Sequence, residues 1–172
     1  GVMYQFTGFT ERAGKALNLA LTAAEEMGHT YVGSEHLLLG LAMDEGSVAS
    51  LLLAKKGVKG SNVRDWIRAG VGVGMATELS PEDFTPRAKH IIENAYRLAR
   101  GMRLSLAGTE HLLLSLLRED GGFGKSLLEK QGISCSGAEK DLRKILLGEP
   151  VSAAEARRAE KKEKKNANQA DH

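Results

Sequence analysis

The sequence predicts an all-α fold with eight helices, built as a tandem duplication of a four-helix unit with pseudo-two-fold symmetry. The first observation is that "FTERA…GSEHLLL", residues 9–39, returns as "FTPRA…GTEHLLL", residues 84–114, in a gapless alignment. A period this long indicates a duplicated supersecondary unit. The second observation is that apolar residues recur at spacings of three and four, and no stretch has the alternation of a strand.

The first unit covers residues from about 6 to 72. Thr10 is a natural N-cap for its first helix, and Gly28 is a natural stop. The expected buried face of this helix is Ala13, Ala16, Leu17, Ala20, Leu21 and Ala24. Ser34 is expected to cap a second, apolar helix that Gly46 interrupts. Val48 to Leu53 suggest a third helix, and Ser61 opens a fourth.

The second unit, from about 80 to 148, copies the first. Thr85 takes the place of Thr10, and Pro86 stands at the first helical position, where the missing N–H of proline costs nothing. The buried stripe of this helix is expected to be Ala88, Ile91, Ile92, Ala95, Leu98 and Ala99. Thr109 matches Ser34. For the last helix, Ser136 and Glu139 suggest a capping box.

These boundaries make residues 1–148 the double-repeat domain, with a glycine-rich connector, "RAGVGVGMATELSPED", between the units. Residues 149–172 have almost no large apolar side chain and many charges. Such a composition cannot bury a core face, so we expect a charged linker or disordered tail. A linker in this position suggests that more protein follows it.

Composition excludes several classes of protein. The formal charge of +2 is nearly balanced and gives no basic excess for binding a phosphate backbone, so no nucleic-acid partner is expected. The single cysteine, Cys135, excludes an internal disulfide and fits a reducing compartment. No apolar run reaches membrane-spanning length. The sequence therefore predicts a cytoplasmic protein with no membrane partner.

Two glycine-rich stretches resemble nucleotide-binding loops, but their context is wrong. "GVGVG", from Gly70 to Gly74, follows a helix and not a strand. "EDGGFGKS" carries Glu119 where a phosphate-binding loop requires glycine, and this carboxylate would repel phosphates. A helix–helix turn explains the second stretch better, and no cofactor is expected in this chain.

The adjacent Glu–His pairs at Glu35–His36 and Glu110–His111 invite a metal or general-base interpretation. Helical metal ligands need a spacing of four, however, and adjacent residues point to different sides of the helix. A histidine on a half-buried face, bonded to a neighbouring carbonyl, is the preferred interpretation. A metal-dependent hydrolase that uses these pairs is kept as an alternative.

The repeated "GSEH" and "GTEH" place a hydroxyl residue and a carboxylate at a helix start, which capping alone can explain. Each unit also has a second capped start, at Thr10 or Thr85. If two such starts lie together, their N–H groups suit an anion and the neighbouring glutamate suits a guanidinium. A pocket of this kind would favour a ligand that carries both groups.

These paired motifs, closed by "LLLAKKGV" and "LLEKQGI", resemble the amino-terminal double repeat of the Clp family of AAA+ unfoldases, specifically the ClpC type. The resemblance covers residues from about 6 to 148. It implies a module that binds adaptors and tagged substrate proteins and is joined to an ATPase ring that feeds the ClpP peptidase. ATP would belong to ATPase modules that this chain lacks, so the chain itself is expected not to be an enzyme.

In ClpC-type domains the module also includes pockets for phosphorylated arginine, a degradation tag. Carried over by position, the resemblance implies a first pocket with Thr10, Ser34 and Glu35. The second pocket would use Thr85, Thr109 and Glu110. Ser34 stands where threonine is usual, and the second unit has "RLSLA" in place of "GHTYV". The remaining alternative is a free-standing Clp repeat protein that acts as an adaptor or decoy.

Overall fold

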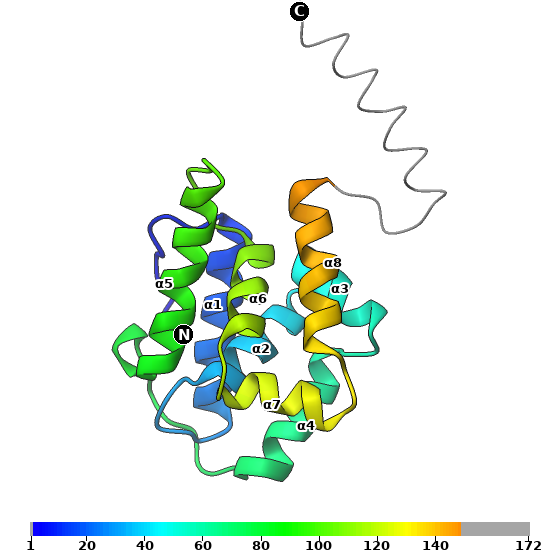
Figure 1. Ribbon diagram of the computed structural model, residues 1–172. Helices are drawn as coiled ribbons and strands as arrows, with labels where there is room; N and C mark the ends of the chain where they lie inside the picture. Colours follow the sequence, from blue (N-terminus) through cyan, green and yellow to red (C-terminus); the bar gives the residue numbers. More distant parts are fainter. Residues whose placement is uncertain (1, 149–172) are drawn as a thin grey trace, which may run out of the picture.

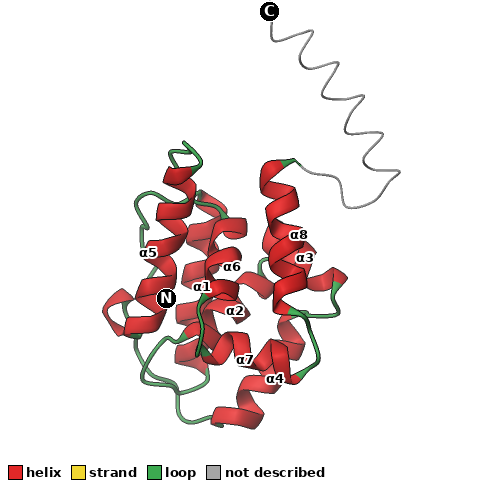
Figure 2. Cartoon of the chain, viewed as in Figure 1, coloured by secondary structure: helices red, strands yellow, loops and turns green. Residues whose placement is uncertain are grey.

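The computed structural model describes residues 2–148, and helices make up most of this part (Figures 1 and 2). Within it there are eight α-helices, one short 3-10 helix and no strand, which confirms the predicted class. The helices are α1 (Glu11–Glu26), α2 (Ser34–Met43), α3 (Val48–Lys55), α4 (Gly60–Val71), α5 (Pro86–Gly101), α6 (Thr109–Arg118), α7 (Phe123–Lys130) and α8 (Cys135–Leu147), with the 3-10 helix η1 (Pro81–Asp83) before α5. The predicted linker or tail, residues 149–172, lies outside the described residues.

The predicted caps of the two long outer helices are confirmed. Thr10 Oγ1 accepts a hydrogen bond from the Ala13 N–H at 3.1 Å, and Thr85 Oγ1 accepts one from the Ala88 N–H at 3.0 Å. Gly28 follows the end of α1 with a φ of +76°, a conformation that glycine adopts without steric cost.

Two other predicted helix starts are wrong by one or two residues. Helix α4 begins at Gly60 and not at Ser61, because Asn62 Oδ1 accepts the N–H of the N-cap Lys59 at 3.0 Å. Helix α8 begins at Cys135, capped by Ser134, whose Oγ accepts from the Gly137 N–H at 3.0 Å.

The capping box expected of Ser136 and Glu139 is therefore absent. Glu139 instead binds the Arg118 guanidinium on α6 at 2.7 Å. The predicted connector is also shorter than expected, since α4 continues to Val71 and η1 occupies part of the remainder.

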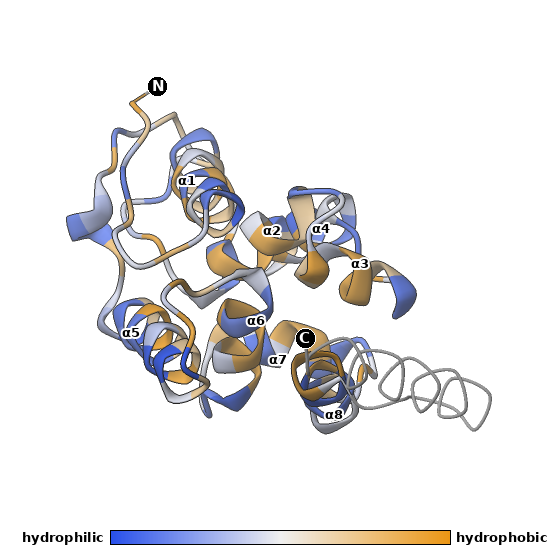
Figure 3. Cartoon of the chain, turned by 90° about the horizontal axis from the view of Figure 1, so that it is seen from above, coloured by the Kyte–Doolittle hydropathy of each residue, from blue (hydrophilic) through white to orange (hydrophobic). Residues whose placement is uncertain are grey.

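Helices α2 and α6 lie at the centre of the molecule, where Figure 3 shows them as largely hydrophobic, and α1 and α5 pack on them from one side. The leucines that follow each Glu–His pair are buried, including Leu38 and Leu113, which are both 0% exposed. Among the described residues, no single helix is long and apolar enough to cross a bilayer. Helices α2 and α3 reach the required length only together, with a bend of 93° between them.

The two repeats are joined by interactions that come in symmetric pairs. Phe9 of the first repeat bridges to Ala107 of the second, and Phe84 bridges to Val32 in return. Because Phe9 aligns with Phe84 and Val32 with Ala107, exchanging the repeats maps one bridge onto the other. This is the contact pattern expected of the predicted pseudo-two-fold arrangement.

Candidate functional site

The helix starts that carry the repeated motif have glycine, not a hydroxyl residue, at the cap position. Gly33 precedes α2 and Gly108 precedes α6, both in an extended conformation. Ser34 and Thr109 are therefore the first residues of their helices, and the prediction that they cap their own helices is wrong.

The two hydroxyls instead cap helices of the opposite repeat. Ser34 Oγ accepts a hydrogen bond from the N–H of Gly124, the second residue of α7, at 2.9 Å. Thr109 Oγ1 accepts one from the N–H of Ala49, the second residue of α3, at 3.3 Å. Ser34 and Thr109 are each only 3% exposed, so their hydroxyls are engaged inside the protein.

The motif histidines accept the backbone N–H of the N-cap glycine at each helix start. His36 Nδ1 accepts the Gly33 N–H at 2.9 Å, and His111 Nδ1 accepts the Gly108 N–H at 2.9 Å. A side chain at the third helical position that bonds back to the N-cap N–H is half of a capping box. Both histidines are buried, and their Nδ1 partner is a backbone N–H and not the carbonyl predicted from the sequence.

The motif glutamates fold back over the preceding glycines. A β-carbon added to Gly33 would overlap Oε1 of Glu35, and one added to Gly108 would overlap Oε1 of Glu110. Each carboxylate thus occupies the space that the glycine leaves open, at the positive end of its helix. Burial raises the pKa of the Glu35 carboxyl above its usual value, and hydrogen bonding to its own backbone N–H and to Tyr31 partly opposes this increase in pKa.

The structure pairs the four helix starts across the repeats. Thr10 donates its backbone N–H to Ala107 O at 2.9 Å, which places the start of α1 beside the start of α6 and Glu110. Thr85 donates its N–H to Val32 O at 2.9 Å, which places the start of α5 beside the segment that leads into α2 and Glu35. This is the reverse of the expected grouping within each repeat, because the segments that lead into α1 and α5 pair with the opposite repeat.

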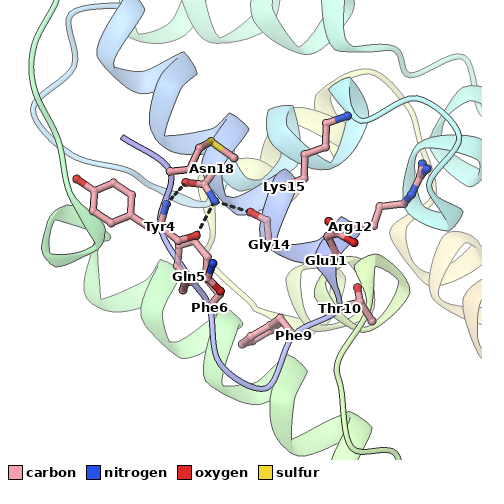
Figure 4. A pocket seen from close by; sticks show the side chains of 11 residues that line it. Tyr4, Gln5, Phe6, Phe9, Thr10, Glu11, Arg12, Gly14, Lys15 and Asn18 are labelled. Atoms are coloured by element: carbon pink, nitrogen blue, oxygen red, sulfur yellow. Dashed lines mark hydrogen bonds between the residues drawn. The ribbon is translucent and has the colours of Figure 1, made fainter. Parts of the chain in front are cut away.

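A cavity of about 650 Å³ lies at the start of α1 (Figure 4). Its lining combines the aromatic rings of Phe6 and Phe9 with the cationic side chains of Arg12 and Lys15, and it includes Thr10. Glu11 also lines the cavity, and Arg12 and Lys15 lie 3.9 and 3.5 Å from the buried carboxylate of Asp44, so their positive charge is partly offset. The N–H groups of a helix start still favour an anionic ligand. Glu110 is not among the lining residues. It lies near the start of α6, just after Ala107, whose carbonyl oxygen accepts the Thr10 N–H.

The sequence did not identify His29 and Tyr31 as site residues. His29 Nδ1 lies 2.7 Å from His36 Nε2, and the His29 Nε2 lies 2.9 Å from Gly72 O in the connector. Burial, and then the nearby His29, lower the pKa of His36 to about 3. The only sequence signal for this cluster is that the second repeat lacks the corresponding "GHTYV".

The metal interpretation of the Glu–His pairs has no support in the geometry. Within residues 2–148, no group of three or more His, Cys, Asp or Glu side chains could hold a metal ion. The predicted helix–helix turn in "EDGGFGKS" is confirmed, since α6 ends at Arg118 and α7 begins at Phe123.

Both repeats match a known family, the Clp repeat (R) N-terminal domain, over residues 8–82 and 83–169. The chain is 36% identical over 141 residues to the chaperone protein ClpB of Oceanobacillus iheyensis, covering 82% of this chain and 17% of that protein. It is 37% identical over 142 residues to the negative regulator of genetic competence ClpC/MecB of Bacillus subtilis, again covering 82% of this chain and 17% of the relative. The chain therefore spans about a sixth of the length of these relatives.

Solved structures share the fold. The N-terminal domain of the chaperone ClpD of Arabidopsis thaliana superposes with a TM-score of 0.69 at 24% identity, covering 81% of this chain and 97% of that one. The ClpV N-domain in complex with a VipB peptide gives a TM-score of 0.61 at 21% identity, covering 84% of this chain and 89% of that one.

Proposed function

The chain belongs to the Clp repeat (R) N-terminal domain family, and from this premise we propose that it recognises substrate and adaptor proteins for an ATP-dependent Clp chaperone. The matched region is the repeat domain of relatives such as ClpC/MecB, which supports a recognition role rather than a catalytic one. The complex of the ClpV N-domain with a VipB peptide supports binding of partner proteins by this fold. The proposed partners are adaptors, tagged substrates, the parent AAA+ ring and, through it, the ClpP peptidase, in the cytoplasm.

At the level of chemistry, the proposed ligand is phosphoarginine on a tagged protein. The observation that carries this proposal is the pairing of two helix starts with one glutamate: α1 and α6 with Glu110, and α5 and α2 with Glu35. The helix starts offer backbone N–H groups to the phosphate, and the glutamate accepts hydrogen bonds from the guanidinium. Arg12 and Lys15 add positive charge beside Thr10, which the nearby Asp44 carboxylate partly offsets.

The six residues predicted from the sequence have different roles in this proposal. Thr10 and Thr85 shape the helix starts that face the phosphate, and Glu35 and Glu110 hold the guanidinium. Ser34 and Thr109 anchor the starts of α2 and α6, which carry the glutamates, because their buried hydroxyls accept hydrogen bonds from α7 and α3 of the opposite repeat.

Calorimetric titration of free phosphoarginine tests the proposal. Removing one charge-assisted hydrogen bond, worth about 1.5–3 kcal/mol, should weaken the affected site about ten- to a hundred-fold. We therefore expect E35A and E110A each to weaken one site by this factor and the double variant to weaken both. Phosphoserine should bind much more weakly, because it lacks the cation that a glutamate requires.

The matched control is E93A, which removes an exposed carboxylate from α5. Equal affinity of the wild type and the double variant, or equal affinity of the wild type for phosphoserine, would refute the pocket assignment. Binding of adaptor proteins would then still be open to a direct test by pull-down.

A further inference from the structure

The two motif glutamates have the same local sequence but different neighbours. In the first repeat, the Tyr31 hydroxyl donates to Glu35 Oε2 at 3.3 Å. In the second repeat, Leu106 occupies the position of Tyr31 and is 47% exposed. Within the described chain, no side chain makes the corresponding hydrogen bond to Oε2 of Glu110.

Tyr31 is held in place by the two histidines of the first repeat. Its ring stacks on His29, with centroids 5.9 Å apart and an interplanar angle of 6°, and it meets His36 edge-on at 5.5 Å. These contacts favour the ring orientation in which the hydroxyl points to Glu35.

The histidines are themselves fixed by a directed chain of hydrogen bonds. Because Nδ1 of His36 accepts the Gly33 N–H, the proton of the neutral ring is on Nε2 and is donated to Nδ1 of His29. His29 then carries its proton on Nε2 and donates it to Gly72 O. Each of these three hydrogen bonds therefore has a defined direction when both rings are neutral.

The second repeat lacks this support. Leu104 stands at the position of His29 and is 42% exposed. His111 Nε2 is buried, and among residues 2–148 it has no hydrogen-bond partner. Tyr31, which bonds to Glu35, and His29, which packs on Tyr31, therefore have no polar counterpart at the equivalent positions of the second repeat.

These differences change how accessible the two carboxylates are. Glu35 is 4% exposed, and its two oxygens face the helix start and the Tyr31 hydroxyl. The Glu110 side chain lies over its helix start in the same way but is 21% exposed, and its Oε2 has no partner corresponding to the Tyr31 hydroxyl among the described residues. The Glu110 carboxylate is therefore the more accessible of the two to a cation from solvent.

We propose that Tyr31 is a specificity-determining gate that closes the Glu35 site, so that the Glu110 site takes a guanidinium ligand first and more tightly. This inference rests on the proposed function, in which both glutamates accept a guanidinium. Of the two duplicated sites, the Glu110 site is then open and the Glu35 site is closed by Tyr31. A client with two tags would engage Glu110 first and gain avidity only when Tyr31 moves.

The test isolates each site before changing its neighbour, with free phosphoarginine as the titrant. In an E110A background, only the Glu35 site remains, and Tyr31→Phe removes the hydroxyl while keeping the ring. We expect this variant to bind about ten-fold more tightly than E110A alone, since a competing hydrogen bond to a charged group is lost. In an E35A background, the exposed Leu106→Tyr should weaken the Glu110 site by a similar factor.

Tyr96→Phe in the E110A background is the matched control, because it removes the hydroxyl of an exposed tyrosine on α5, and it should leave the affinity unchanged. If Tyr31→Phe leaves the affinity of the Glu35 site unchanged or lowers it, the gate is refuted while the pockets stand. If neither the wild type nor any variant binds phosphoarginine, the proposed function fails and the gate fails with it. Leu106→Tyr lies at an exposed position, so its result does not depend on the stability of the cluster around His29.

Discussion

At the scale of single residues, the repeated Gly-(Ser/Thr)-Glu-His motif is a complete helix start. The glycine leaves room for the carboxylate, the hydroxyl reaches the opposite repeat, and the histidine accepts the N-cap N–H. Each residue type is required by a contact of its own. The motif would therefore be needed for folding even if it bound no ligand.

His36 makes the stability of the protein depend on pH. Its pKa is lowered from 6.5 to about 3 in the folded state, so the unfolded state binds the proton more readily between these values. The free energy of unfolding should therefore fall as pH decreases from about 6.5 to 3, with a slope approaching ~1.4 kcal/mol per pH unit. Glu35, whose pKa is raised, contributes with the opposite sign, because its stabilising effect is lost as pH rises.

Urea denaturation at several pH values measures this slope. His36→Asn keeps an acceptor for the Gly33 N–H but cannot take up a proton in this range, so its slope should be smaller than that of the wild type. The groups that face His36 in the described structure, His29, Tyr31 and Glu35, are unchanged in this comparison. An identical slope in the two proteins would show that His36 is not the titrating group.

At the scale of helices, the α1–α2 and α5–α6 pairs are equivalent in the two repeats but pack through different residues. Gly40 on α2 faces α1, and an added β-carbon would overlap the carbonyl oxygen of Ala16 and lie 3.0 Å from Ala20 N. The equivalent Ser115 on α6 instead donates its hydroxyl to Ile91 O on α5 at 2.7 Å. Helix α2 thus packs closely on α1 because Gly40 has no side chain, whereas α6 is joined to α5 by the Ser115 hydrogen bond.

Alanine at these two equivalent positions should give unequal losses. Gly40→Ala should cost about 1–3 kcal/mol or more of unfolding free energy, because the obstructing atoms belong to the backbone and cannot move away. Ser115→Ala should cost only about 0.5–1.5 kcal/mol, the usual contribution of a hydrogen bond. Gly101→Ala, where the added carbon meets nothing within 4 Å, is the control and should cost far less than Gly40→Ala. Equal losses at positions 40 and 115 would contradict the described packing.

At the scale of the whole molecule, the two repeats are expected to unfold as one unit. The hydroxyl caps on α3 and α7 and the two backbone bridges all cross from one repeat to the other. Neither repeat keeps its helix starts satisfied without its partner. Cooperative unfolding is the usual behaviour of single domains of this size.

Leu113→Ala tests this coupling. Leu113 is fully buried in the second repeat, so its truncation should cost about 2–5 kcal/mol. The single tryptophan, Trp66, lies on α4 of the first repeat and serves as a fluorescence probe within that repeat. We expect Trp66 fluorescence and far-UV circular dichroism to shift to the same lower denaturant midpoint.

Leu38→Ala, at the equivalent position in the first repeat, is the matched control and should shift both signals in the same way. If Leu113→Ala lowers the circular dichroism midpoint but leaves the Trp66 midpoint of the wild type unchanged, the repeats unfold independently.

The sequence by itself determined the features that depend on local physics. Helix periodicity and duplication predicted eight helices in two repeats, and the caps at Thr10 and Thr85 followed from hydrogen bonds that span only three residues. Ser61 and Ser136 misled the prediction of two helix starts, because several polar residues near each start compete for the same N–H groups and only the folded backbone selects one.

Only the tertiary structure decided where the motif side chains go. The partners of Ser34 and Thr109 lie in the opposite repeat, at separations of 90 and 60 residues, and Thr10 lies beside Glu110 rather than Glu35 because Phe9 bridges to Ala107. The link from His29 to Gly72 likewise spans 43 residues. Local propensity carries no information about such contacts, since they form only when the core leucines bring the two repeats together.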